Sequence, residues 1–234
     1  MVRGIAIDGP AGAGKSTIAR RVARALGFQY IDTGAIYRAL TLKAYRANIP
    51  LDDEHALNAL VAGTDLTFQA REDGSLELYM DGTSVGEAIR APEIGERVSL
   101  LARHPRVREA VVKQLKTLAE QMDVVMDGRD IGTVVMPDAM LKIYLTASLE
   151  ERHRRRLLEL EQKGLDVDAE RVKDELQKRD DLDYSRASGP LKIADGAVVL
   201  DTTGLDIETV TETIVQMARE RMNRLKVSSS HPPS

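Results

Sequence analysis

The stretch Gly9-Pro10-Ala11-Gly12-Ala13-Gly14-Lys15-Ser16-Thr17 decides how the rest of the chain is interpreted. Gly9, four further residues and Gly14-Lys15-Ser16 form the pattern G-x-x-x-x-G-K-[ST], which is typical of a phosphate-binding loop. The apolar run at 4–7 predicts a strand before it, and the apolar spacing over 16–26 predicts a helix behind it. A glycine-rich turn between a strand and a helix is the alternative, and the full pattern in this context favours the phosphate loop.

The residue types of this loop match the chemistry of a nucleoside triphosphate. Glycines let backbone N–H groups converge on a polyphosphate at the positive end of a helix. We expect Lys15 to neutralise the β- and γ-phosphates and the Ser16 hydroxyl to complete the shell of a Mg²⁺ ion. The residues predicted to bind ATP, with Mg²⁺ as cofactor, are Gly9, Pro10, Ala11, Gly12, Ala13, Gly14, Lys15, Ser16 and Thr17.

Composition describes an ordinary globular protein. The 234 residues suffice for one domain with a modest insertion, and 43% are hydrophobic and 30% charged. No apolar run reaches the roughly 20 residues of a membrane helix, and we expect no secretory signal before the first strand. The absence of cysteine excludes disulfides and thiolate metal sites and fits a cytoplasmic location. A net charge of −4 argues mildly against nucleic acid as the main partner.

The chain alternates between helical and strand patterns, which predicts an α/β fold with a parallel sheet covered by helices. The expected strands are 3–8, 29–32, 124–127, 140–146 and 197–201. The expected helices run from the loop to Gly27, then over 33 to about 47, 53–62, 92–103, 105–121, 149–163, 168–182 and 206–226. Ser148 to Glu151 resembles a capping box, and Asp206 is expected to cap the last helix.

Two runs with period-two alternation, 64–70 and 76–80, interrupt this alternation of helix and strand. They predict a small antiparallel β subdomain at about 63–85, inserted into a P-loop NTPase-type core formed by 1–62 and 86–226. Residues 227–234, rich in serine and proline, are expected to be a disordered tail.

Two arginine-rich regions favour phosphoryl transfer to a small anionic acceptor. Arg152, Arg154, Arg155 and Arg156 crowd one predicted helix, and Arg179, Asp183 and Arg186 are spaced to share a helix face. Arginine next to a triphosphate stabilises charge on the transferring group. The alternatives are a solvated face with ion pairs or, for the protein as a whole, a GTPase switch or a motor. The absence of an Asn-Lys-x-Asp motif weakens the GTPase alternative.

Five motifs together closely resemble the bacterial cytidylate (CMP) kinases. They are 9–17, 32–38 (Asp-Thr-Gly-Ala-Ile-Tyr-Arg), 105–108 (Pro-Arg-Val-Arg), 127–133 (Asp-Gly-Arg-Asp-Ile-Gly-Thr) and 179–186. The resemblance extends from about residue 3 to 220. It implies the nucleoside monophosphate kinase fold, with a core, a monophosphate-binding insertion and a mobile helical lid at about 152–165.

The resemblance also implies roles for individual residues. Those expected to bind CMP are Thr33, Arg38, Ser99, Arg108, Asp130, Arg179, Asp183 and Arg186. Those expected to act in catalysis are Lys15, Arg129, Arg156 and Arg186, and those expected to hold the metal are Ser16 and Asp127. Ala11 stands where many relatives have serine, so any contact of that hydroxyl is missing here.

The implied reaction transfers the γ-phosphoryl group of Mg·ATP to CMP or dCMP, giving ADP and CDP or dCDP, by a monomeric enzyme. Two alternatives remain open. One is a kinase for another small acceptor, such as UMP or a non-nucleotide alcohol. The other is a non-catalytic, ATP-dependent switch or adaptor.

Overall fold

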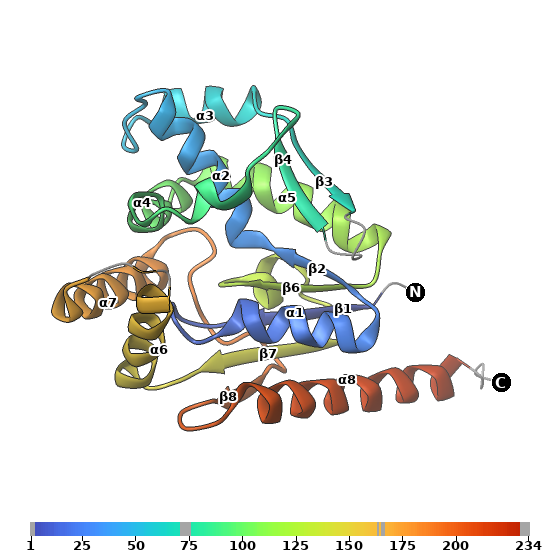
Figure 1. Cartoon of the computed structure of the whole chain (residues 1–234). Coiled ribbons are helices and arrows are strands. Elements are labelled where there is room, and N and C mark those ends of the chain that lie inside the picture. The colour runs from blue at the N-terminus through green and yellow to red at the C-terminus, as the bar shows by residue number, and fades with distance from the viewer. Residues whose placement is uncertain (1–2, 71–75, 163, 165–166, 230–234) are drawn as a thin grey trace.

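The chain forms a five-stranded parallel sheet with helices on both faces (Figure 1). This computed structural model describes residues 3–70, 76–162, 164 and 167–229. The strand order is β2 (Gln29–Asp32), β6 (Val124–Gly128), β1 (Gly4–Asp8), β7 (Leu141–Thr146) and β8 (Val198–Asp201). All four pairings are parallel. The carboxyl ends of the strands therefore meet at one edge, where such folds bind ligands.

The faces of the sheet follow from the alternation of side chains along β1. Ile5 and Ile7 point to one face, where they join a core with α1 (Lys15–Leu26) and α8 (Ile207–Ser229). Ala6 points to the other face and belongs to a second core. Both faces are apolar because each is covered, as expected for a parallel sheet.

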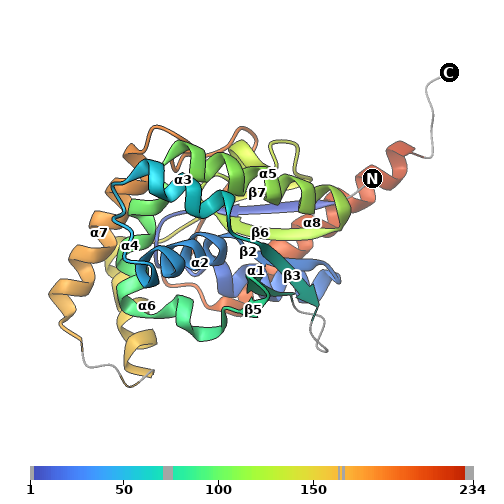
Figure 2. The same ribbon diagram turned by 90° about the horizontal axis from the view of Figure 1, so that it is seen from above.

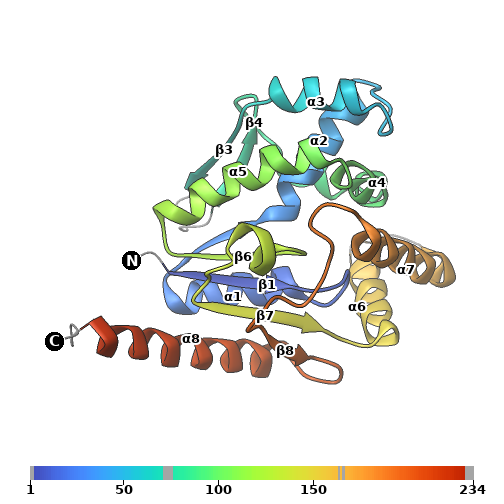
Figure 3. The ribbon, with the colours of Figure 1, turned by 180° about the vertical axis from the view of Figure 1, so that it is seen from behind.

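The second core is shared by four helices and the small antiparallel sheet (Figures 2 and 3). The helices are α2 (Thr33–Arg46), α3 (Glu54–Ala62), α4 (Pro92–Ala102) and α5 (Pro105–Gln121). The sheet contains β3 (Leu66–Ala70), β4 (Leu76–Met80) and the short β5 (Thr83–Ser84). Leu78 of β4 and Val85 are buried in this core, so the sheet packs on the helices and shares their core.

Helices α6 (Leu149–Gln162) and α7 (Ala169–Ser185) pack against each other and stand together at the carboxyl ends of the strands (Figure 1). Asp168 caps α7, since its side chain accepts a hydrogen bond from the Glu170 N–H. Only half of the expected capping box forms in α6. The Ser148 hydroxyl accepts from the Glu151 N–H at 3.2 Å, but the Glu151 carboxylate pairs with Arg154 and Arg155.

The sequence-based strands and helices are confirmed within a few residues. A 3-10 helix at Gly86–Arg90 and a π-helical turn at Ile131–Val135 were not expected. Helix α7 extends to Ser185, so Arg186 is its C-cap residue. Helix α8 extends to Ser229, three residues into the segment expected to be disordered, while 230–234 lie outside the described residues, as does the expected turn at Asp73-Gly74.

Across the part of the chain that the structure describes, each helix is too short or too polar to cross a lipid bilayer.

Candidate functional site

The phosphate loop joins β1 to α1 at the carboxyl end of the sheet. Gly12 and Gly14 have φ values of 74° and 85°, a left-handed conformation that favours glycine. Gly9 has a φ of 152°, and a Cβ there would overlap the carbonyl oxygen of Leu145 on the adjacent β7. Gly14 is the N-cap of α1, so the loop places its backbone at a helix N-terminus, which attracts anions.

Lys15 is the first residue of α1, and only 6% of its surface is exposed. Its Nζ donates a hydrogen bond to the carbonyl oxygen of Pro10 at 2.7 Å, within the loop itself. Burial lowers the pKa of Lys15 well below its usual range, and the positive charge of Arg129 lowers it further, while Asp127 partly opposes this. A polyphosphate in the loop would raise that pKa again, so the lysine is suited to an anionic ligand.

Ser16 and Asp127 lie side by side, as a shared metal ligand role requires. The Ser16 hydroxyl donates to Asp127 Oδ2 at 2.7 Å, and the Tyr30 hydroxyl donates to Oδ1 at 2.9 Å. Burial raises the pKa of the Asp127 carboxyl, and the nearby charge of Asp32 raises it further. A hydroxyl and a carboxylate are oxygen ligands of the type that Mg²⁺ prefers, so this pair fits the ion.

Asp8 is a residue of the site that the sequence analysis did not single out. It ends β1, is 3% exposed, and accepts hydrogen bonds from the backbone N–H groups of Ile131 at 2.8 Å and Gly132 at 2.7 Å. Burial raises the pKa of Asp8 to about 6, although the two N–H groups oppose this. Asp8 thereby anchors the segment that carries Arg129 and Asp130, and an acid at the end of a buried strand was the available signal.

Asp183 of α7 pairs with Arg129, which is distant in the sequence, and with Arg186, three residues further along the chain. Its Oδ2 accepts from Arg129 Nε at 2.6 Å, and its Oδ1 lies 3.5 Å from Arg186 Nη1. Burial alone would raise the pKa of Asp183, but the charges of Arg129, Arg179 and Arg186 hold it below its usual range. The single carboxylate therefore faces more positive charge than it neutralises.

Arg179 supplies much of that excess. Its Nε is buried and has no hydrogen-bond partner among the described residues. Burial lowers the pKa of Arg179 to about 10, and the positive charges of Arg129, Arg38 and Arg156 add to this effect. A buried guanidinium nitrogen without a hydrogen-bond partner is costly, and an anion beside these arginines would relieve the cost.

Arg108 and Asp130 form a buried ion pair between α5 and the end of β6, with side chains 2% and 7% exposed. Arg186 Nη2 approaches the other oxygen of Asp130 at 3.5 Å. Gly189, at φ 55°, lies directly against the pair, since a Cβ there would overlap both Asp130 Oδ2 and Arg108 Nη2. Two of the residues expected to bind CMP, Arg108 and Asp130, are thus together, and Gly189 was missed because nothing local in the sequence signals it.

Four other residues predicted to function have different surroundings, and three of them have partners in the structure. The Thr33 hydroxyl donates to the carbonyl oxygen of Asp127 at 2.6 Å, and Arg38 pairs with Asp32 at 2.7 Å. Ser99 is buried on α4, and its hydroxyl bonds to neither Arg108 nor Asp130 within the described residues. Arg156 pairs with Glu159 on its own helix at 2.8 Å.

The arginine cluster of α6 divides into different roles. Arg154 pairs with Glu151 and is largely exposed, and Arg155 pairs with Glu151 and donates to the Thr202 carbonyl at 2.7 Å. Arg152, by contrast, is 7% exposed and contacts the phosphate loop. The spacing of the four arginines could not separate these roles.

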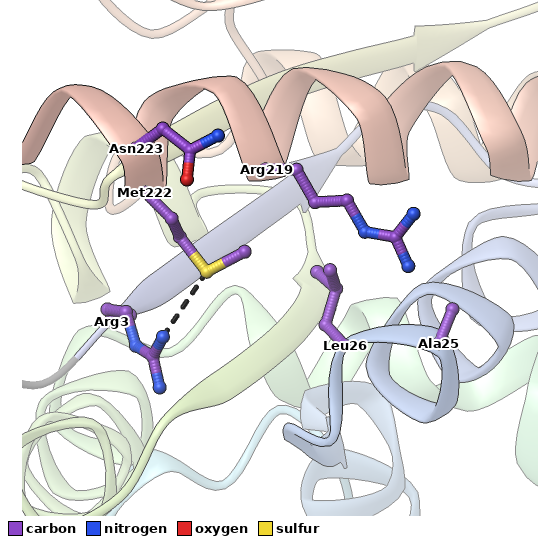
Figure 4. Close-up of a pocket in the computed structure, with 6 residues that line it drawn as sticks. All are labelled: Arg3, Ala25, Leu26, Arg219, Met222 and Asn223. Atoms are coloured by element: carbon purple, nitrogen blue, oxygen red, sulfur yellow. Dashed lines mark hydrogen bonds between the residues drawn. The ribbon is translucent and has the colours of Figure 1, made fainter. Parts of the chain in front are cut away.

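A cavity of about 410 Å³ lies away from this site, between α1 and α8 (Figure 4). It is lined by Arg3, Ala25, Leu26, Arg219, Met222 and Asn223. Arg3 is already paired with Asp123 and donates to the sulfur of Met222 at 3.3 Å. Arg3 is thus occupied, and none of the residues predicted to function lines the cavity.

Comparison with known proteins agrees with this geometry. The family model described as cytidylate kinase matches residues 5–220. The cytidylate kinase of Caldanaerobacter subterraneus subsp. tengcongensis is 51% identical over 216 residues, covering 92% of this chain and 94% of that protein. The cytidylate kinase of Desulfitobacterium hafniense is 48% identical over 227 residues, covering 97% of each.

Among solved structures, an uncharacterized protein from Eubacterium ventriosum shares the fold, with a TM-score of 0.50, 12% identity and coverage of 93% of this chain and 98% of that one. A family model that spans nearly all of the chain, together with relatives about half identical to it, shows that the chain belongs to the cytidylate kinase family.

Proposed function

We propose that this protein transfers the γ-phosphoryl group of Mg·ATP to CMP or dCMP. An oxygen of the acceptor phosphate bonds to the γ-phosphorus, the bond from that phosphorus to the β–γ bridging oxygen breaks, and ADP leaves with the electron pair. The products are ADP and CDP or dCDP. The acceptor phosphate is already anionic, so the reaction needs alignment and charge neutralisation rather than a general base.

The observation that carries this proposal is the buried Arg108–Asp130 pair next to arginines with excess positive charge. Arg129, Arg179 and Arg186 would bind the acceptor phosphate, and Arg38 would join them by releasing Asp32. Arg108 and Asp130 would turn toward the base. A base-reading pair beside a second phosphate site matches a nucleoside monophosphate, and a switch protein has no need of such a site.

On the donor side, the loop backbone and Lys15 would hold the β- and γ-phosphates. Ser16 and Asp127 would hold Mg²⁺, which supplies charge neutralisation between those phosphates when it is bound. The segment at about 152–165, which begins within α6, would act as a lid that excludes water, with Arg156 released from Glu159 toward the phosphates. Residues 163, 165 and 166 lie outside the described residues.

A panel of acceptors tests the proposal directly. ADP release is measured with Mg·ATP and each of CMP, dCMP, UMP, a simple alcohol or no acceptor. We expect turnover with CMP and dCMP at least about 100-fold above UMP. Uracil would place its N3–H against the Arg108 guanidinium and its O4 against the Asp130 carboxylate, and each buried mismatch of this kind costs roughly 1–3 kcal/mol. ADP release that is the same with and without acceptor would leave a switch or an ATPase as the function.

We also propose that the protein acts as a cytoplasmic monomer, as the family resemblance implies. Light scattering behind gel filtration at micromolar concentration tests the oligomeric state, and a mass of twice the chain's 25.8 kDa would contradict it.

A further inference from the structure

The ion pair between Arg152 and Asp180 binds the backbone of the phosphate loop on both sides of the Ala11 Cα, at the Ala11 N–H and at the Ala11 carbonyl oxygen. Asp180 Oδ1 accepts a hydrogen bond from the Ala11 N–H at 2.9 Å, and Arg152 Nη1 donates to the Ala11 carbonyl oxygen at 2.8 Å. The same Nη1 lies 2.5 Å from Asp180 Oδ2. Both residues are nearly buried, at 7% and 3% exposed.

We propose that Arg152 and Asp180 are positioning residues that hold the loop in the shape that binds the triphosphate. The idea rests on the proposed function only in taking ATP as the ligand of the loop, and it does not depend on which acceptor is used. The two residues act through the Ala11 backbone rather than through contact with the substrate.

The loop needs these two bonds, which together we call the Ala11 brace, because glycines lie on either side of Ala11. Gly9 and Gly12 both have positive φ values, and the backbone of glycine can adopt more conformations than that of any other residue. A loop of this composition loses much conformational entropy when it is fixed around a ligand. Bonds to both ends of the Ala11 residue reduce that freedom before ATP arrives, which strengthens binding.

The position of the pair links the loop to the base of the α6–α7 unit. Arg152 lies in the first turn of α6, and Asp180 lies in the last third of α7. The loop packs closely against both helices at Gly12. A Cβ on Gly12 would lie 3.1 Å from Arg152 Cβ on α6 and 3.5 Å from a methyl carbon of Leu176 on α7. Both bonds go to backbone atoms, so the alanine that replaces a serine of many relatives preserves the brace.

The test measures the affinity for Mg·ATP without any acceptor, in wild type, Asp180→Ala, Arg152→Ala and the double variant. The double variant matters because Asp180→Ala alone leaves a buried arginine unpaired and risks misfolding. We expect the dissociation constant for ATP to rise roughly 10- to 100-fold in the double variant, as for the loss of charge-assisted hydrogen bonds. The KM for CMP at saturating ATP should stay within about twofold.

Arg171→Ala is the matched control, since Arg171 also lies on α7 and pairs with acids but is 65% exposed. Hydrogen exchange provides the second readout: the peptide covering 9–17 should exchange faster in the double variant than in the control, while β6 and β7 remain protected. Asp180→Asn keeps an oxygen for the Ala11 N–H, so it should recover part of the affinity.

Three results would overturn the proposal. ATP affinity equal to wild type in the double variant would make the pair a structural contact only. Tighter ATP binding would mean that Asp180 competes with the phosphates. Equal losses of affinity for ATP and CMP would indicate general destabilisation. If ATP binding depends on the pair but no acceptor is phosphorylated, the positioning role stands and the proposed function fails.

Discussion

The donor side and the acceptor side of the site are built in opposite ways. The phosphate loop is nine consecutive residues, and its geometry comes from glycine backbone at the N-terminus of α1. The proposed acceptor side consists of side chains from α2, α5, the end of β6 and α7, held mainly by ion pairs between residues far apart in the chain. Changes on the donor side should therefore affect every acceptor alike, whereas changes on the acceptor side should discriminate between acceptors.

The largest expected effect lies on the donor side. Lys15→Ala should lower kcat about 1,000-fold with CMP and with dCMP, because the lysine meets charge that develops between the β- and γ-phosphates. Steady-state turnover at saturating Mg·ATP and CMP measures it, with thermal melting to confirm folding. Lys113→Ala, an exposed lysine on α5, is the control. Turnover of Lys15→Ala within tenfold of wild type would exclude this role.

On the acceptor side, Asp130→Asn and Arg108→Met should lower the CMP/UMP ratio of kcat/KM about 100-fold. Cytosine offers acceptors at N3 and O2 and a donor at its amino group, so a guanidinium and a carboxylate suit it. Uracil reverses two of these groups, and a neutral amide can rotate to suit either base.

Arg106→Met is the control for these two variants, since Arg106 is exposed and lies on α5 together with Arg108. If both variants lose activity but keep the wild-type ratio, Arg108 and Asp130 hold the fold or the phosphate rather than the base.

Asp8 connects the two sides and makes the stability depend on pH. Its pKa of about 6 exceeds the ordinary 3.8, so the folded protein binds this proton more tightly than the unfolded chain. Between those values the contribution of Asp8 to folding therefore becomes less favourable as pH rises, by about 1–3 kcal/mol in all. Urea unfolding of wild type and Asp8→Asn from pH 4 to 7 should show a flatter dependence in the variant.

Asp127, whose pKa is also raised, contributes to both curves and cancels in the difference. Asp138→Asn, at an exposed site, should keep the wild-type slope. Parallel curves for Asp8→Asn and wild type would show that Asp8 has an ordinary pKa.

A smaller loss of activity is expected from a change at Gly189, in the loop after α7, which lies against Arg108 and Asp130. Gly189→Ala would push a methyl group against Asp130 and Arg108, so kcat/KM for CMP should fall about tenfold. ATP affinity should not change. Gly196→Ala has a similar φ of 71° but open space around its Cα, so it separates the effect of the clash from that of backbone strain. Equal losses in the two variants would point to strain.

The smallest expected effect concerns the lid. Hydrogen exchange over 152–165 should slow several-fold when ATP and CMP analogues are bound together, because the segment closes over both ligands. Helix α3, on the far side of the second core, should exchange equally in both states. Equal exchange over 152–165 would leave this segment an ordinary surface helix.

Local patterns explain why most of the fold was predictable. The strands of the sheet are short apolar runs, and Asp53, Asp168 and Asp206 cap helices through side-chain oxygens at the ends that the sequence indicated. The π-helical turn at Ile131–Val135 was not predictable, because it depends on Asp8, more than a hundred residues away, accepting the N–H groups of Ile131 and Gly132.

The sequence by itself determined the phosphate loop, the parallel sheet and the family, because each depends on consecutive residues or on a local period. Only the tertiary structure decided which charges meet. Four arginines crowded on α6 look equivalent in sequence, yet Arg152 alone faces Asp180 and the Ala11 peptide, while Arg154 pairs in solvent. Ion pairs form between side chains that the packed helices bring within a few ångströms of each other, and the spacing of residues in the sequence does not predict which side chains these are.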